Sequence, residues 1–236
     1  SLKAKRKGYR MSALSLLKLL HVSDSAFPSG SFAFSNGLET IVKELHIANK
    51  SELADLLINQ VAARWFEFDR YFINQAFLCA RSISELRRLD ASCHVQNTNE
   101  AFALASRGIG RSLITVHKKL QTKGIIAFSD AVYSGKNSDD SGYEPVIRGL
   151  IGNSLNLSQS ETEIGALFGT VNAFSSAAIR MNIIGALEAQ QIIADALPKL
   201  CEMLAADCPN QATSSTLLSE IAASRHKHLD ISLFSN

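Results

Sequence analysis

The sequence lacks the long apolar run that a membrane-spanning helix requires. None of its 236 residues belongs to an apolar stretch near the roughly 18 residues that span a bilayer, and its start lacks the apolar core of a signal peptide. We therefore expect a cytoplasmic protein with no membrane partner. Its 46% apolar content is still enough to bury a substantial core, in one large domain or two small ones.

Cysteine is scarce, with four residues in the whole chain. No two of them have the Cys-x-x-Cys spacing, and a chain this long and apolar does not need a disulfide framework. Cys79, in FLCA, and Cys201, in KLCEML, are both predicted to lie on buried helix faces. The cysteines are therefore expected to be core thiols.

Motifs for nucleotide binding and nucleophilic catalysis are also missing. The chain has no Gly-x-x-x-x-Gly-Lys-Ser/Thr loop, and GIGRS at 108–112 lies in a helical pattern rather than after a strand. It has no Gly-x-Ser-x-Gly elbow. The acidic pair Asp139–Asp140 stands among Ser and Gly in a polar loop. We predict a protein that is not an enzyme, has no cofactor and does not bind nucleic acid.

The six histidines are scattered, and only His226 and His228 lie close together. Residues two apart on a helix point in different directions, which makes this pair a poor metal site. No neighbouring cysteine or carboxylate pair completes a ligand set. A structural or solvent-facing role is favoured, and the two histidines stay weak metal candidates.

The positive charge is concentrated at the start of the sequence. Five basic residues and no acidic one fall within residues 1–10, which leaves 19 of the 24 Lys and Arg against 22 acidic residues elsewhere. With Met11 as a natural translation start, residues 1–10 are interpreted as a disordered basic extension or a segment foreign to the native protein. A basic arm for nucleic acid or membrane is the less favoured reading.

Helical spacing of apolar residues dominates the rest, and strand-like alternation is nowhere sustained. We predict an all-α, single-domain bundle of roughly ten helices over residues 11–228, followed by a tail, 229–236. Ser158 and Glu161 form a capping-box pattern ahead of the apolar stretch 164–183, predicted to be the most buried helix. Pro198 is predicted to start a new helix. The expected helices cover about residues 14–21, 31–45, 51–78, 84–95, 100–121, 125–132, 145–155, 158–183, 186–197, 198–207 and 214–229.

The segment FPSGSFAFSNGLE, residues 27–39, packs a proline, two glycines and three phenylalanines into thirteen positions. Residues 23–30 read as a turn, in which Asp24, Ser25 and Ser29 can bond nearby backbone N–H groups, Pro28 fixes φ and Gly30 permits a positive φ. Gly37 is unfavourable inside the following helix and implies either close packing or a partner.

This segment resembles the N-terminal signature of the UreF family of urease accessory proteins, which runs Phe-Pro-x-Gly-x-Phe-x-x-Ser-x-Gly-Leu-Glu. The matching residues are Phe27, Pro28, Gly30, Phe32, Ser35, Gly37, Leu38 and Glu39.

Three later blocks and the C-terminal tail are similar to the family in the same order along the chain. They differ from it at Tyr143, where the family usually has histidine, and at Ala186, Lys227 and Ser232. The matching residues are Ser106, Gly110, Arg111 and Leu113; Pro145, Val146 and Gly149; Arg180, Gly185 and Gln190; and, in the tail, His226, Leu233 and Phe234.

Charged residues in small or apolar surroundings are the candidates for recognition. Buried charges must be paired or touch a partner, so Glu39 is either an internal ion-pair member or an interface residue. Arg107, Arg111 and Arg180 share this ambiguity. The tail carries the apolar residues Leu229, Ile231, Leu233 and Phe234, which either fold back or dock on another protein.

The resemblance favours docking and implies a function. Members of the family form a maturation complex with UreD, also called UreH, and the GTPase UreG, in which UreF pairs as a homodimer. It implies that this chain bridges these partners and helps to couple GTP hydrolysis to nickel delivery into apo-urease. It also implies that the signature segment, Arg111, Arg180, Gln190 and the tail bind partners. The alternatives are a metallochaperone that itself carries nickel and, less favoured, a helical enzyme with a dispersed site.

Overall fold

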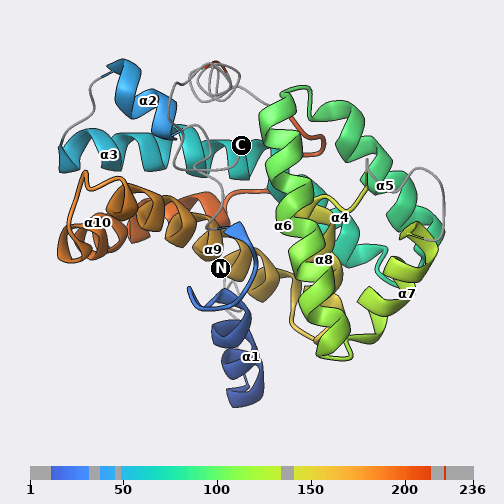
Figure 1. The fold of residues 1–236 in the computed structure, drawn as a ribbon. Helices are drawn as coiled ribbons and strands as arrows, with labels where there is room; N and C mark the ends of the chain where they lie inside the picture. The colour runs from blue at the N-terminus through green and yellow to red at the C-terminus, as the bar shows by residue number, and fades with distance from the viewer. Residues whose placement is uncertain (1–11, 32–37, 46–48, 134–140, 214–220, 222–236) are drawn as a thin grey trace, which may run out of the picture.

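The computed structural model describes residues 12–31, 38–45, 49–133, 141–213 and 221, which form helices and no strand (Figure 1). The all-α, single-domain prediction is confirmed. The helices are α1 (Ala13–Ser23), α2 (Leu38–Leu45), α3 (Lys50–Leu56), α4 (Arg70–Leu78), α5 (Ile83–Gln96), α6 (Glu100–Lys119), α7 (Lys123–Tyr133), α8 (Glu144–Ser154), α9 (Gln159–Arg180) and α10 (Ala186–Ala205).

Helices α3 and α4 are parts of one unbroken helical segment. Two π-helical stretches, Leu57–Ala62 and Trp65–Asp69, connect them without a turn. The described residues therefore contain fewer separate helices than the roughly ten expected. None of the described helices is long and apolar enough to cross a bilayer.

Helix α9 runs through the middle of the domain, between α1, α8 and α10 (Figure 1). Its start is fixed by the predicted capping box: the Glu161 amide donates to Ser158 Oγ at 3.1 Å, and the Ser158 amide donates to Glu161 Oε2 at 2.6 Å. This part of the sequence prediction is correct, because the pattern that produces the cap is local.

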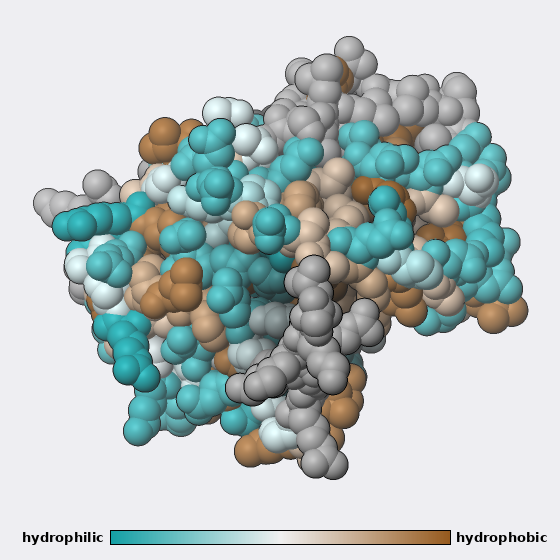
Figure 2. Space-filling model, turned by 180° about the vertical axis from the view of Figure 1, so that it is seen from behind, coloured by the Kyte–Doolittle hydropathy of each residue, from teal (hydrophilic) through white to brown (hydrophobic). Residues whose placement is uncertain are grey.

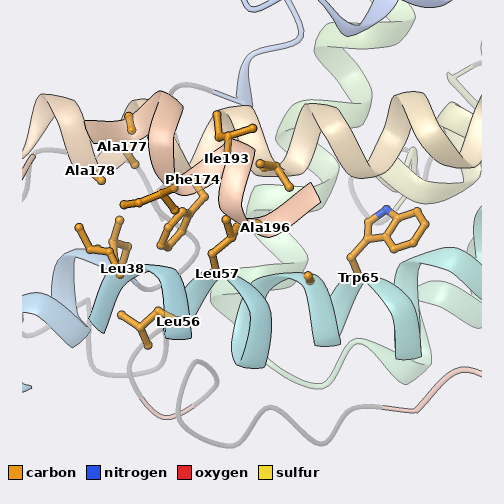
Figure 3. Close-up of a cluster of buried hydrophobic side chains, with 14 of the residues drawn as sticks. Leu38, Leu56, Leu57, Trp65, Phe174, Ala177, Ala178, Ile193 and Ala196 are labelled. Carbon is orange, nitrogen blue, oxygen red and sulfur yellow. The ribbon is translucent and has the colours of Figure 1, made fainter. Parts of the chain in front are cut away.

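Two apolar clusters fill the interior. The first joins α2, α3, α9 and α10, and includes Leu38, Leu57, Phe174 and Ile193 (Figure 3). The second joins α4 to α8 and includes Phe27 from the signature segment. Leu38, the first residue of α2, is only 1% exposed, so the end of the signature segment is anchored in the first cluster.

Helix α8 crosses α4 at Gly149. A Cβ atom there would lie 2.2 Å from the Ile73 carbonyl oxygen, a distance that real Cβ atoms do not show. This close approach gives a packing reason for a glycine in the middle of a helix.

Two sequence predictions are wrong. Pro198 lies inside α10 instead of starting a helix. It is on the solvent side of α10, where water can bond the backbone carbonyl that the missing proline N–H leaves without a partner. Ala196 and Leu200 are buried on the opposite side of the helix. Cys201 is exposed and Cys79 half-buried, whereas Cys93 is buried. The errors at Pro198 and Cys201 come from treating α10 as two helices with independent faces, whereas Cys79 is the C-cap residue of α4, at the end of its buried face.

Candidate protein-interaction surface

The signature segment begins with the predicted turn, between α1 and the residues before α2. The Ala26 amide donates to Asp24 Oδ1 at 2.6 Å, and the Ser31 amide donates to Ser29 Oγ at 3.3 Å. Gly30 has φ +77°, and a Cβ atom there would lie 2.6 Å from Ser112 Oγ. The turn is thus set by its own side chains and held close to α6.

Phe27 anchors this turn in the second apolar cluster. Its side chain is buried, and its ring centroid lies 5.6 Å from that of His117 and 5.4 Å from that of His21. His117 is also buried, and burial lowers its pKa to about 4, so its ring is neutral at physiological pH. Phe27 therefore positions the turn from inside the domain, whereas Pro28 is exposed and available for contact.

Glu39 lies in the first turn of α2, where a carboxylate is favoured by the helix dipole. It is fully buried. A partner could reach it only if α2 moved, so the burial favours the internal alternative over direct contact.

The other candidates are distributed over distant elements. Arg111 is half-buried on α6, while Arg180, at the end of α9, and Gln190, on α10, are exposed. Arg107 Nη1 donates to the Tyr143 hydroxyl at 2.7 Å, so that arginine is used inside the fold. Several candidates lie outside the described residues: Phe32, Ser35, Gly37, His226, His228, Leu229, Leu233 and Phe234.

A small polar hollow of about 60 Å³ lies beside the end of the signature turn. Ser31 lines it together with Asp69 and an ion pair in which Arg148 Nε donates to Glu144 Oε1 at 2.7 Å. Burial raises the pKa of Asp69 to about 6, against the smaller opposing influence of Arg64. This carboxylate is held where its charged form is disfavoured, which is more common at functional sites than elsewhere.

An apolar surface on α1 and α9, which sequence reasoning missed, lies next to the turn. Six large apolar side chains are between 38% and 64% exposed: Leu14, Leu16, Leu17, Leu20, Ile164 and Phe168. We call these six residues the α1/α9 surface. Between the two helices runs a groove of about 600 Å³, lined by Leu20, Ile164 and Phe168. In Figure 2, hydrophobic side chains are visible at the lower end of the molecule, where α1 lies.

The α1/α9 surface belongs to a helix that is firmly held. Leu19 on the opposite side of α1 is buried against Gly165 of α9, and Lys18 Nζ donates to the Leu155 carbonyl at 2.8 Å. The signal for this surface was present in the sequence: leucines 14, 16, 17, 19 and 20 cover more than one face of a helix, so some of them had to face outward.

No group of three or more His, Cys, Asp or Glu side chains that could hold a metal ion occurs within the described ranges. A helical domain with a large exposed apolar surface is typical of a binding or scaffold protein.

Comparison with known proteins gives the family. Residues 47–197 match the UreF family model, so the chain belongs to the UreF family of urease accessory proteins. It is 29% identical to the urease accessory protein UreF of Trichodesmium erythraeum over 235 residues, covering 93% of this chain and 96% of that protein. It is 22% identical to UreF of Haemophilus influenzae strain Rd over 221 residues, covering 92% and 93%. The protein is therefore an accessory protein and not an enzyme.

Proposed function

We propose that the protein is a scaffold in urease maturation. It joins UreD to the GTPase UreG, works as a homodimer in the cytoplasm, and helps to couple GTP hydrolysis to nickel delivery into apo-urease. Family membership supports the role in urease maturation. The α1/α9 surface is the single observation that supports protein binding as the means.

We assign the α1/α9 surface to UreD. Monomeric proteins rarely expose contiguous apolar patches of this kind unless a partner covers them. Large apolar side chains that become fully desolvated dominate binding energy at interfaces. The exposed Pro28 and the C-terminal tail with Leu229, Leu233 and Phe234 are the second and third parts of the proposed contact.

The test compares two equally drastic changes at exposed leucines. Leu17→Glu places a charge in the α1/α9 surface, and Leu187→Glu places one on α10, where the leucine is 74% exposed. Co-purification with UreD should be lost with Leu17→Glu and kept with Leu187→Glu, while both variants melt within a few degrees of the wild type. Retained UreD binding by Leu17→Glu would refute the assignment, and loss of the homodimer alone would give the surface to a second copy.

The nickel-carrier alternative has a separate test. Isothermal titration with nickel, on protein lacking residues 1–10, should show no stoichiometric micromolar binding. Such binding, abolished by changing His226 and His228, would favour a metallochaperone.

A further inference from the structure

Arg70, at the start of α4, binds the end of α10 from inside the domain. Its side chain is only 5% exposed. Nη1 donates to the carbonyl oxygens of Met203 and Ala206, both at 2.9 Å, and Nη2 donates to the Leu204 carbonyl at 3.0 Å. The last carbonyls of a helix have no partner within the helix, and a cation is favoured at this end of the helix dipole. One guanidinium thus caps α10.

Glu163 of α9 completes this arrangement. Arg70 Nη2 donates to Glu163 Oε2 at 3.1 Å, and the other carboxylate oxygen accepts from the Asn74 amide. The same Asn74 amide lies 3.1 Å from Cys208 Sγ, in the segment that follows α10. Further along, the Thr213 amide donates to the Glu67 carbonyl at 3.0 Å. Residues 206–213 are therefore fastened along the Trp65–Asp69 stretch and α4.

Stability alone does not explain why a charged pair, Arg70 and Glu163, holds the end of α10 in place. Removing two charges from water costs several kcal/mol per ion, and a buried pair is often replaceable by apolar residues without loss. An apolar pair could not bond three carbonyl oxygens at once, whereas the planar fork of arginine can. What the ion pair adds is a fixed path for the chain as it leaves α10.

We infer that Arg70 and Glu163 form a clamp that fixes where the C-terminal segment leaves the domain, and that UreD affinity depends on this clamp. The inference rests on the proposed function, in which residues beyond 213 reach UreD. A tail held at its base loses less conformational freedom when it binds, so releasing the base weakens binding. Arg70 and Glu163 are positioning residues and touch no partner themselves.

The first measurement needs no partner. Glu163→Gln keeps the shape of the side chain but removes its charge, and hydrogen exchange is followed in residues 204–213. We expect exchange about tenfold faster there, because the carboxylate charge strengthens the hydrogen bonds that hold this segment, with little change in α5 to α7. The control is Lys199→Met, which removes an exposed ion pair of α10 with Glu202. Unchanged exchange in Glu163→Gln would refute the clamp.

The second measurement links the clamp to UreD. Glu163→Gln and Arg70→Lys should each bind UreD at least about tenfold more weakly, Arg70→Lys more so because an ammonium group cannot bond all four oxygens. Wild-type affinity in both variants, with faster exchange, would refute the link to UreD while leaving the proposed function intact. No UreD binding by the wild type would instead refute the proposed function.

A disulfide provides the rescue experiment. In the Glu163→Gln protein, Asn74→Cys places a thiol beside Cys208, and an S–S bond of about 2 Å would refasten the segment without any charge. Oxidation should restore UreD affinity to near the wild-type value, and reduction should remove it again. Failure of the oxidised protein to recover would show that fastening the segment is not what UreD binding requires.

Discussion

The α1/α9 surface and the Arg70–Glu163 clamp are both exceptions to the rule that apolar side chains are buried and charged ones are exposed. On α1 and α9, large apolar side chains face the solvent, with Leu17 as much as 64% exposed. At the end of α10, a guanidinium and a carboxylate are enclosed by the fold, with 5% and 9% of their side chains exposed. Neither placement lowers the free energy of the isolated domain: the first leaves apolar area in water and the second desolvates two charges.

The contrast indicates where binding and positioning reside. Residues that destabilise the isolated domain, and whose cost is not offset by contacts inside it, are candidates for a role in binding a partner. Exposed apolar area of the α1/α9 surface is removed from water only when a partner covers it. The desolvation of the clamp is partly offset inside the domain, by the hydrogen bonds from Arg70 to the α10 carbonyls. We therefore expect mutations in the clamp to change the stability of the domain, and mutations in the surface to change only binding.

The largest effect is expected from breaking the clamp on one side. Arg70→Met should lower the free energy of unfolding by about 3–5 kcal/mol, because Glu163 remains buried without its cation. The double variant Arg70→Met/Glu163→Leu should lose clearly less, since no charge is left unpaired. Urea denaturation of both variants measures this, and an equal or larger loss in the double variant would contradict the explanation.

The two sides of α1 provide the next comparison. Leu19→Ala should cost about 2–5 kcal/mol, because Leu19 is buried against α9. Leu17→Ala, two residues earlier and outward-facing, should stay within about 0.5 kcal/mol of the wild type. Thermal melts of the two variants measure this difference. A large loss of stability in Leu17→Ala would mean that the outward-facing leucines stabilise the domain itself.

Asp69 lies beside Arg70 in sequence but has no comparable set of bonds. Its pKa in the folded state, about 6, is above the ordinary value of 3.8, so the folded state holds the extra proton between these values. Stability should therefore fall as pH rises from about 4 to about 6 and stay lower above that. Asp69→Asn should exceed the wild type at pH 8 by at most about 3 kcal/mol and by little at pH 4. An advantage of the same size at both pH values would exclude titration as its cause.

The smallest effect is expected at the exposed ion pair between α3 and α10. Lys50 Nζ lies 3.2 Å from Asp195 Oδ2, with the two side chains 38% and 70% exposed. Lys50→Met should cost less than about 1 kcal/mol, and salt should reduce even that. Denaturation at low and high salt checks this, and a loss as large as that of Arg70→Met would remove the distinction between enclosed and exposed pairs.

Much of the fold could be predicted from the sequence because the relevant signals are local. The Ser158–Glu161 cap, the start of α6 at Glu100 and the turn before Gly30 each depend on residues a few positions apart. Pro198 was misread because its local preference for a helix start is outweighed by buried neighbours on the same helix.

The functional surface was less accessible to sequence reasoning. Phe27 and Glu39 were expected at an interface and are buried, whereas Leu17 and Phe168 are exposed on helices far apart in the chain. Arg70 and Glu163 are 93 positions apart, and nothing near either residue indicates its partner.

The sequence by itself determined the helical class, the family, the turn before Gly30 and the caps of α6 and α9, because periodicity, capping and motif residues act over a few positions. Only the tertiary structure decided which apolar residues stay in water and which charges leave it. These outcomes depend on how α1, α4, α9 and α10 pack together, and packing brings residues together regardless of their separation along the chain.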